Sequence, residues 1–129
     1  MDNILFCSCG RRATLLKDFR KSMNGCGNIV ATDLSPVAPA LFMADKRYLV
    51  PRIDAPDYFG KILEICRNED VKAITTLIDP EIEILSRHRE ELIKNGVLPL
   101  CPADWTAHLC FDKYEMFKHL GKKGVRTVL

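Results

Sequence analysis

A short apolar strand that passes through a glycine into a helix is the feature that most constrains this chain. The strand is Ile4–Cys7, and its four consecutive apolar residues leave no face for solvent. After Gly10 the apolar residues have helical spacing, at Leu15, Leu16, Phe19 and Met23. Such a helix points its free N–H groups past the strand end, where open α/β sheets bind anionic ligands. The opening of the chain therefore predicts a ligand-binding α/β domain.

Two further apolar runs end on an acidic residue. The first is Asn28–Asp33, and the second is the β-branched run Val71–Asp79, which is followed at once by Pro80–Glu81. Proline is favoured at the first helical position and aspartate is a good N-cap, so we expect Asp79 to cap a helix. If the strands are parallel, all three strand ends lie at one edge of one sheet.

The remaining sequence alternates between helix and strand. Helices are expected at residues 38–45, 58–68, 80–94, 102–109 and 112–120, and strands at residues 47–50 and 97–100. Pro99 places the last strand at a sheet edge. This alternation predicts an open, mainly parallel, five-stranded Rossmann-like α/β sheet with strand order 3-2-1-4-5 and helices on both faces.

Composition excludes several classes of protein. The chain has 129 residues and a net charge of +2, and no basic run interleaved with aromatics suggests nucleic acid. No apolar stretch reaches the roughly 18 residues needed to span a membrane, and the N-terminus lacks a signal peptide. Cys7, Cys66 and Cys110 are expected on apolar faces, although Cys7-Ser-Cys9 leaves open a reactive thiol or a metal pair. A reducing, cytoplasmic setting is expected.

Motifs along the whole chain resemble a known family. They are Ile4–Arg12, Ile29–Pro36, Ala38–Leu41, Ile78–Glu83, and Asp112-Lys113 with Gly124–Thr127. Together they resemble the N-terminal pre-ATP-grasp domain of ATP-grasp ligases, in particular proteins similar to the carbamoyl phosphate synthase large subunit. The resemblance implies that residues 1–111 form a substrate-binding domain. Residues 112–129 would begin the linker into an ATP-grasp domain that this sequence lacks, and the residues after Gly124 are expected to open a further strand.

The resemblance also implies a chemistry. Such ligases phosphorylate a carboxylate with ATP and Mg²⁺, and an amine then attacks the acyl phosphate. Lys113 is similar to a residue that reaches the ATP phosphates from the N-terminal domain, although it could equally be a surface lysine. This fragment is expected to hold no tightly bound cofactor and to be inactive alone. Its partner would be a small carboxylate or amine, without nucleic acid or membrane, and homodimerisation stays open.

The candidate substrate-binding residues lie at the three strand ends: Gly10, Arg11, Arg12, Asp33, Asp79 and Glu81. Two arginines at a helix start are disfavoured by the helix dipole, so a bound anion would explain Arg11 and Arg12, which otherwise are solvated charges. Asp33 is either a ligand or a turn residue, and Asp79 is either a ligand or a cap. Glu81 is the better ligand candidate of the last pair, and the resemblance places Pro80–Glu81 against an amine-bearing substrate.

The sequence leaves two other classes of function open. Ser8-x-Gly10-x-x-Ala13 is a degenerate dinucleotide fingerprint, and Asp33 lies where a ribose-binding acid would sit, so a diverged NAD(P)-binding domain is one alternative. Only one of the three glycine positions holds glycine, which weakens this interpretation. The other alternative is a freestanding module that binds a small molecule or nucleotide.

Overall fold

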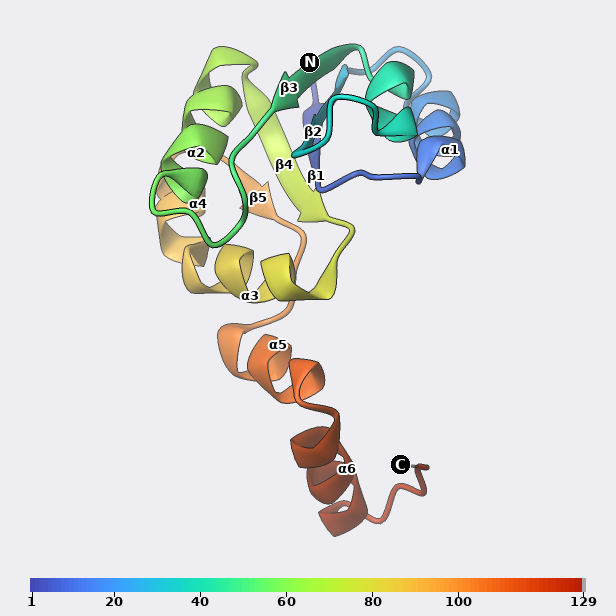
Figure 1. Ribbon diagram of the computed structural model, residues 1–129, viewed down its shortest axis with the longest axis vertical. Coiled ribbons are helices and arrows are strands. Elements are labelled where there is room, and N and C mark those ends of the chain that lie inside the picture. The colour runs from blue at the N-terminus through green and yellow to red at the C-terminus, as the bar shows by residue number, and fades with distance from the viewer. Residues whose placement is uncertain (129) are drawn as a thin grey trace.

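The computed structural model describes residues 1–128 and contains one five-stranded sheet with helices on both faces (Figure 1). The strands are β1 (Asn3–Cys7), β2 (Ile29–Asp33), β3 (Lys46–Leu49), β4 (Val71–Thr76) and β5 (Leu98–Pro99). They lie in the order β3-β2-β1-β4-β5, and each neighbouring pair is parallel. The predicted fold class and strand order are confirmed.

The sheet is buried on both faces along its centre. α1 (Ala13–Met23) and the 3₁₀ helix η1 (Pro39–Met43) cover one face, where Phe6 packs with Leu16 and Leu41. On the other face, Leu5 joins a larger cluster with side chains of α2 (Tyr58–Asn68), α3 (Asp79–Arg87) and α4 (Arg89–Lys94). Alternate β1 residues thus enter opposite cores, which is why this strand is apolar without interruption. Each large side chain buried in this way contributes about 1.5–3 kcal/mol.

Several element boundaries differ from the sequence prediction. The helix expected at residues 80–94 is divided at His88, whose backbone (φ −95°, ψ 17°) interrupts the helix between α3 and α4. The strand expected at 97–100 is reduced to Leu98–Pro99, although it does lie at a sheet edge. Asp79 is not the N-cap of α3, because Ile78 occupies that position and no side chain caps the helix.

The C-terminal helices extend away from the sheet. α5 (Asp104–Phe111) packs on α3, and α6 (Lys113–Lys122) follows it outward (Figure 1). One prediction fails here: Cys110, which was expected on an apolar face, is exposed. Trp105, in the first turn of α5, is 67% exposed as well. Residues 125–128 form no strand, and residue 129 of the expected linker lies outside the described residues.

Among residues 1–128, no helix is long and apolar enough to cross a membrane.

We expect Gly27→Ala to destabilise the fold severely, because a Cβ at Gly27 would lie 2.4 Å from the backbone oxygen of Asp2. Separating the two backbone segments would strain the start of β1, at a cost of about 2 kcal/mol or more. Urea unfolding measures the effect. Gly60→Ala is the matched control, because its Cβ meets nothing within 4 Å and alanine favours the helix by roughly 0.5–1 kcal/mol. Equal stability of the two variants would contradict this packing.

Candidate functional site

The candidate site lies at the carboxyl ends of the central strands. The chain builds β2 and β3 on one side of β1 and then places β4 and β5 on the other. Open α/β sheets bind their ligands at such a switch point, where the loops from neighbouring strands diverge. The loops that follow β1, β2 and β3 all contribute to a cavity of about 370 Å³ at this edge. That volume suits a small metabolite.

The cavity combines polar and apolar walls. Its polar lining comes from five residues: Ser8, Gly10, Arg12, Asp33 and Arg52. Its remaining wall consists of Leu34, Val50, Pro51, Ile53, Tyr58 and Ile78. The guanidinium groups belong to exposed residues, whereas Tyr58 is 1% exposed. The solvent side of the cavity therefore carries the positive charges, and the wall at Tyr58 is less exposed to water.

Asp33 holds the first two loops together. Its Oδ2 accepts a hydrogen bond from the Gly10 N–H at 2.7 Å, and its Oδ1 accepts one from the Ser35 N–H at 2.9 Å. Gly10 in turn accepts a bond from the Ala40 N–H at 3.0 Å and has a φ of +51°, which a glycine adopts without strain. Of the roles considered for Asp33, these contacts show the turn role, and a ligand role stays a prediction. This geometry disfavours a dinucleotide site. In such a site Asp33 would bind the ribose and the Gly10 loop would face the pyrophosphate, but here the Asp33 carboxylate accepts a bond from the Gly10 N–H.

The two arginines of the first loop differ in position. Arg12 lines the cavity, and its Nη1 lies 3.9 Å from the place that a Cβ on Gly10 would take. Arg11 is exposed and is not part of the cavity lining. Arg12 precedes α1 as its N-cap residue, with no side-chain hydrogen bond to the helix. An anion in the cavity would therefore meet Arg12 rather than Arg11.

Glu81 is fully buried in the first turn of α3. Its Oε2 accepts a hydrogen bond from the Thr76 hydroxyl, while its Oε1 has no partner among residues 1–128. Burial raises the pKa of Glu81 to about 7; the neighbouring Ser8 hydroxyl opposes this rise, and the charge of Asp33 adds to it. A carboxyl group with this pKa exchanges its proton near neutral pH and can accept a hydrogen bond from an amine or hydroxyl.

The remaining predicted residues lie elsewhere. Asp79 is exposed and lines a separate cavity of about 130 Å³ between α3 and α5. Lys113 is exposed at the start of α6, on the helical extension that leads away from the sheet (Figure 1). Its neighbour Asp112 caps α6 by accepting bonds from the Tyr114 and Glu115 N–H groups at 3.0 Å.

Sequence reasoning missed the contributions of the third loop and of α2. Arg52 and Tyr58 line the cavity, and neither stands in a recognisable motif. Tyr58 opens the helix whose apolar face was predicted correctly, so its position suggested only packing. The signal that could have included these residues is the strand order itself, because it places the loop after β3 on the same edge as Gly10 and Asp33.

The thiols near the site are poor nucleophiles. Burial and then the charge of Glu81 raise the pKa of Cys7 well above its ordinary value, and burial and then Asp33 raise that of Cys9 to about 11. Thiolate is the reactive form, so neither residue is reactive at neutral pH. Residues 1–128 contain no group of three or more His, Cys, Asp or Glu side chains arranged to hold a metal ion.

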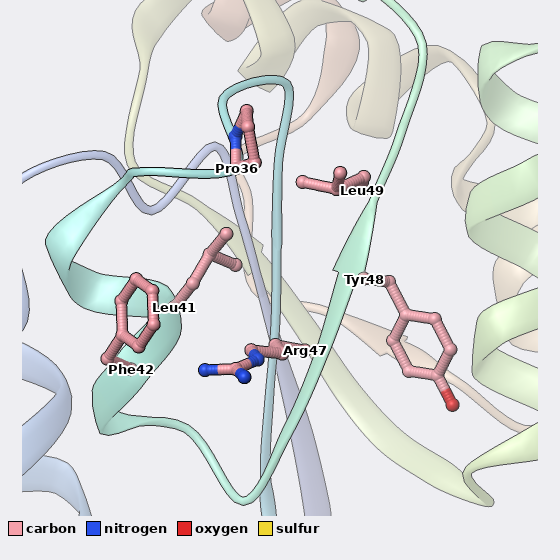
Figure 2. Close-up of a pocket in the computed structure, with 6 residues that line it drawn as sticks. All are labelled: Pro36, Leu41, Phe42, Arg47, Tyr48 and Leu49. Carbon is pink, nitrogen blue, oxygen red and sulfur yellow. The ribbon is translucent and has the colours of Figure 1, made fainter.

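A second cavity, of about 240 Å³, lies over β3 and η1 (Figure 2). Its lining is Pro36, Leu41, Phe42, Arg47, Tyr48 and Leu49. The Arg47 guanidinium carbon stands 4.6 Å from the centre of the Phe42 ring, in a cation–π contact. This second cavity lies beside the β3 edge, and its lining holds no acidic group. We therefore assign the ligand site to the first cavity, at the strand ends.

Comparison with known proteins identifies the family. Residues 4–100 match the family described as PylC-like, N-terminal domain, and the chain belongs to it. The chain matches none of the curated proteins with which it was compared.

Solved structures with the same fold are ATP-grasp enzymes. The biotin carboxylase domain of a single-chain bacterial carboxylase superposes with a TM-score of 0.71 at 15% identity, covering 99% of this chain and 30% of that one. N5-carboxyaminoimidazole synthetase from Staphylococcus aureus, complexed with ADP, gives 0.69 at 16% identity, with 99% and 31% covered. The biotin carboxylase domain dimer of the Hydrogenobacter thermophilus 2-oxoglutarate carboxylase, with MgADP and bicarbonate, gives 0.71 at 19% identity, with 98% and 28% covered.

The chain thus spans less than a third of the length of these structures. Together with the family match, they confirm the predicted resemblance to the N-terminal domain of ATP-grasp ligases and carboxylases.

We expect Asp33→Ala to destabilise the chain by about 3 kcal/mol, because it removes two hydrogen bonds to a charged acceptor and leaves the Gly10 N–H unpaired. The free energy of unfolding in urea measures this loss. Asp54→Ala is the control: Asp54 makes an exposed pair with Arg52, so its loss should change stability by less than about 0.5 kcal/mol. If Asp33→Ala were as stable as Asp54→Ala, Asp33 would not be the residue that holds the loops.

Glu81 should make the chain less stable as the pH rises. Its folded pKa of about 7 exceeds the ordinary value of 4.5, so the folded state binds the proton more tightly than the unfolded chain. The stability that this tighter proton binding contributes is fully present below pH 4.5 and is lost as the pH rises to about 7. The total loss is up to about 3 kcal/mol of unfolding free energy. Glu81→Gln should abolish this trend. The measurement is the difference in unfolding free energy between wild type and variant from pH 4.5 to 8, and a constant difference would contradict the raised pKa.

Proposed function

We propose that residues 1–111 are the substrate-binding domain of an ATP-dependent carboxylate–amine ligase, of the carbamoyl phosphate synthase-like kind, and that residues 112–129 begin the connection to its ATP-grasp domain. The proposal rests on one observation. Arg12 lines the cavity at the strand ends, and Ser8 in the same lining neighbours the buried carboxyl of Glu81. Membership of the PylC-like family and the likeness to ATP-grasp enzymes support it.

The arginine guanidinium and the Glu81 carboxyl suit the two ends of such a substrate. Arg12 offers planar donors to a carboxylate or phosphate, which it can bind bidentately, whereas the Arg52 guanidinium is already paired with Asp54 through Nε and Nη2, each at 3.1 Å. Glu81 is buried behind Ser8, so it acts on a bound amine or hydroxyl through the Ser8 hydroxyl, and its raised pKa allows it to take up or release a proton when such a group binds. The site therefore favours a zwitterion or a phosphorylated metabolite over an apolar ligand.

Residues 1–128 do not themselves fit ATP and Mg²⁺. They hold no cluster of acidic or imidazole side chains for a metal, and Lys113 projects on α6 apart from the cavity. We therefore place the nucleotide and the metal in the rest of the enzyme, where they would activate the carboxylate as an acyl phosphate. The role of this domain is to bind the substrate, orient it and remove it partly from water.

We also propose that the enzyme works in the cytoplasm on small molecules, because all six cysteines are free thiols, as expected in a reducing compartment. A homodimer is compatible with this role, since the Hydrogenobacter thermophilus domain is itself a dimer.

The test is ADP release by the full-length protein on a panel of amino acids, dicarboxylates and phosphorylated metabolites. Turnover should require a substrate, and the 129-residue chain alone should release no ADP. Arg12→Ala should raise the substrate KM roughly tenfold, the scale of one lost charge-assisted hydrogen bond. Arg11→Ala is the matched control and should leave KM unchanged, because Arg11 lies outside the cavity lining. Magnesium-dependent ADP release by the 129-residue chain, or equal effects of the two variants, would contradict the proposal.

A further inference from the structure

Tyr58 carries a hydroxyl group that the fold buries without pairing. The side chain is 1% exposed at the start of α2, and its hydroxyl oxygen has no hydrogen-bond partner among residues 1–128. Buried polar groups are almost always hydrogen-bonded, because an unpaired one loses its interactions with water and regains nothing. Phenylalanine would fill the same volume without this cost, so packing does not account for the hydroxyl.

The position of Tyr58 connects this hydroxyl to the cavity. Tyr58 is part of the cavity wall, together with Ser8 and Val50. It also belongs to the apolar cluster on the α2 side of the sheet, which includes Cys7 at the carboxyl end of β1. The residue that carries the unpaired hydroxyl therefore belongs both to the cavity wall and to the core on the α2 side of the sheet.

The unpaired oxygen of Glu81 lies on the same side of the sheet. Cys7 pairs with Thr76 across β1 and β4, and the Thr76 hydroxyl donates to the other oxygen of Glu81. Two groups with free hydrogen-bonding capacity thus occur where β1 and β4 end, although Glu81 reaches the cavity only through its neighbour Ser8.

Tyr48 is a second tyrosine of this fold, and its hydroxyl is hydrogen-bonded within the chain. Its hydroxyl donates to the Glu69 carboxylate, which joins β3 to the end of α2. The two tyrosines therefore form a natural pair for comparison: one hydroxyl has a partner within the chain and the other has none.

We propose that the Tyr58 hydroxyl is a specificity-determining contact, which hydrogen-bonds a hydroxyl or amino group at the inner end of a ligand whose anionic end faces Arg12. The proposal rests on the cavity assigned under the proposed function and names the group that the ligand must carry there. A site with a buried hydroxyl binds a polar group well and rejects a methyl group in its place, because the hydroxyl would then stay unpaired.

The first test needs no ligand. We expect Tyr58→Phe to leave the Tm of the 129-residue chain unchanged or higher, because it removes an unpaired polar atom. Tyr48→Phe should lower the Tm, because it breaks the bond to Glu69. Thr32→Val removes another buried, unpaired hydroxyl that does not line the cavity, and it should also not lower the Tm. If Tyr58→Phe lowered the Tm as much as Tyr48→Phe, the hydroxyl would be structural and the proposal would be wrong.

The second test uses three probes of equal length: 4-aminobutanoate, 4-hydroxybutanoate and butanoate. The wild-type chain should bind the first two more tightly than butanoate in an NMR titration. Tyr58→Phe should weaken the amino and hydroxyl probes roughly three- to tenfold and leave butanoate unaffected. Thr32→Val should keep the wild-type order.

Two outcomes of the titration would overturn the proposal: equal binding of all three probes by the wild-type chain, or an unchanged order of affinities in Tyr58→Phe. Either result is distinct from failure of the proposed ligase function, which is judged by substrate-dependent ADP release. A protein without that activity could still discriminate among the probes.

Discussion

The Asp33 carboxylate is the interaction on which the site depends. It is the last residue of β2, and it accepts the backbone N–H groups of Gly10 and Ser35. These two bonds fix the loop after β1 against the loop after β2, so that Arg12 faces the cavity at the start of α1. A neutral side chain at this position would leave the loops without their common anchor. The chain thus places a charge where it shapes the cavity and adds to the rise in the pKa of Glu81, which burial mainly causes.

The second constraint is the cost of polar groups in the interior. Glu81 and Tyr58 are buried, and each keeps an oxygen with no partner among residues 1–128. Such groups reduce stability, and proteins hold destabilising features mainly at functional sites. Both residues lie near the carboxyl ends of the strands, where open α/β sheets bind their ligands.

Much of this architecture could be predicted from the sequence. The apolar runs of β1 and β2, the β-branched run of β4 and the helical spacing in α2 indicated alternating strands and helices, and this alternation predicted the fold and the strand order. The shared edge of Gly10, Asp33 and Glu81 followed from parallel strands. Whether Asp33 binds a ligand, as opposed to its confirmed turn role, stays a prediction, as does the ligand role of Glu81.

The remainder depended on three-dimensional packing. The helix break at His88 and the shortness of β5 leave no clear signal in local periodicity. Asp79 and Glu81 are two residues apart and therefore point in different directions from α3, which exposes the first and buries the second. α5 leads away from the sheet, so that Trp105 and Cys110 on this helix are exposed.

The most direct test of this account is the titration of the Glu81 carboxyl carbon, followed by ¹³C NMR in the 129-residue chain. We predict a midpoint near pH 7, because burial penalises the charged form. Saturation with 4-aminobutanoate should shift the midpoint downward, since a bound ammonium group favours the carboxylate. A midpoint near 4.5 that the amine leaves unchanged would show that Glu81 is an ordinary solvated carboxylate and would contradict the assignment of the site.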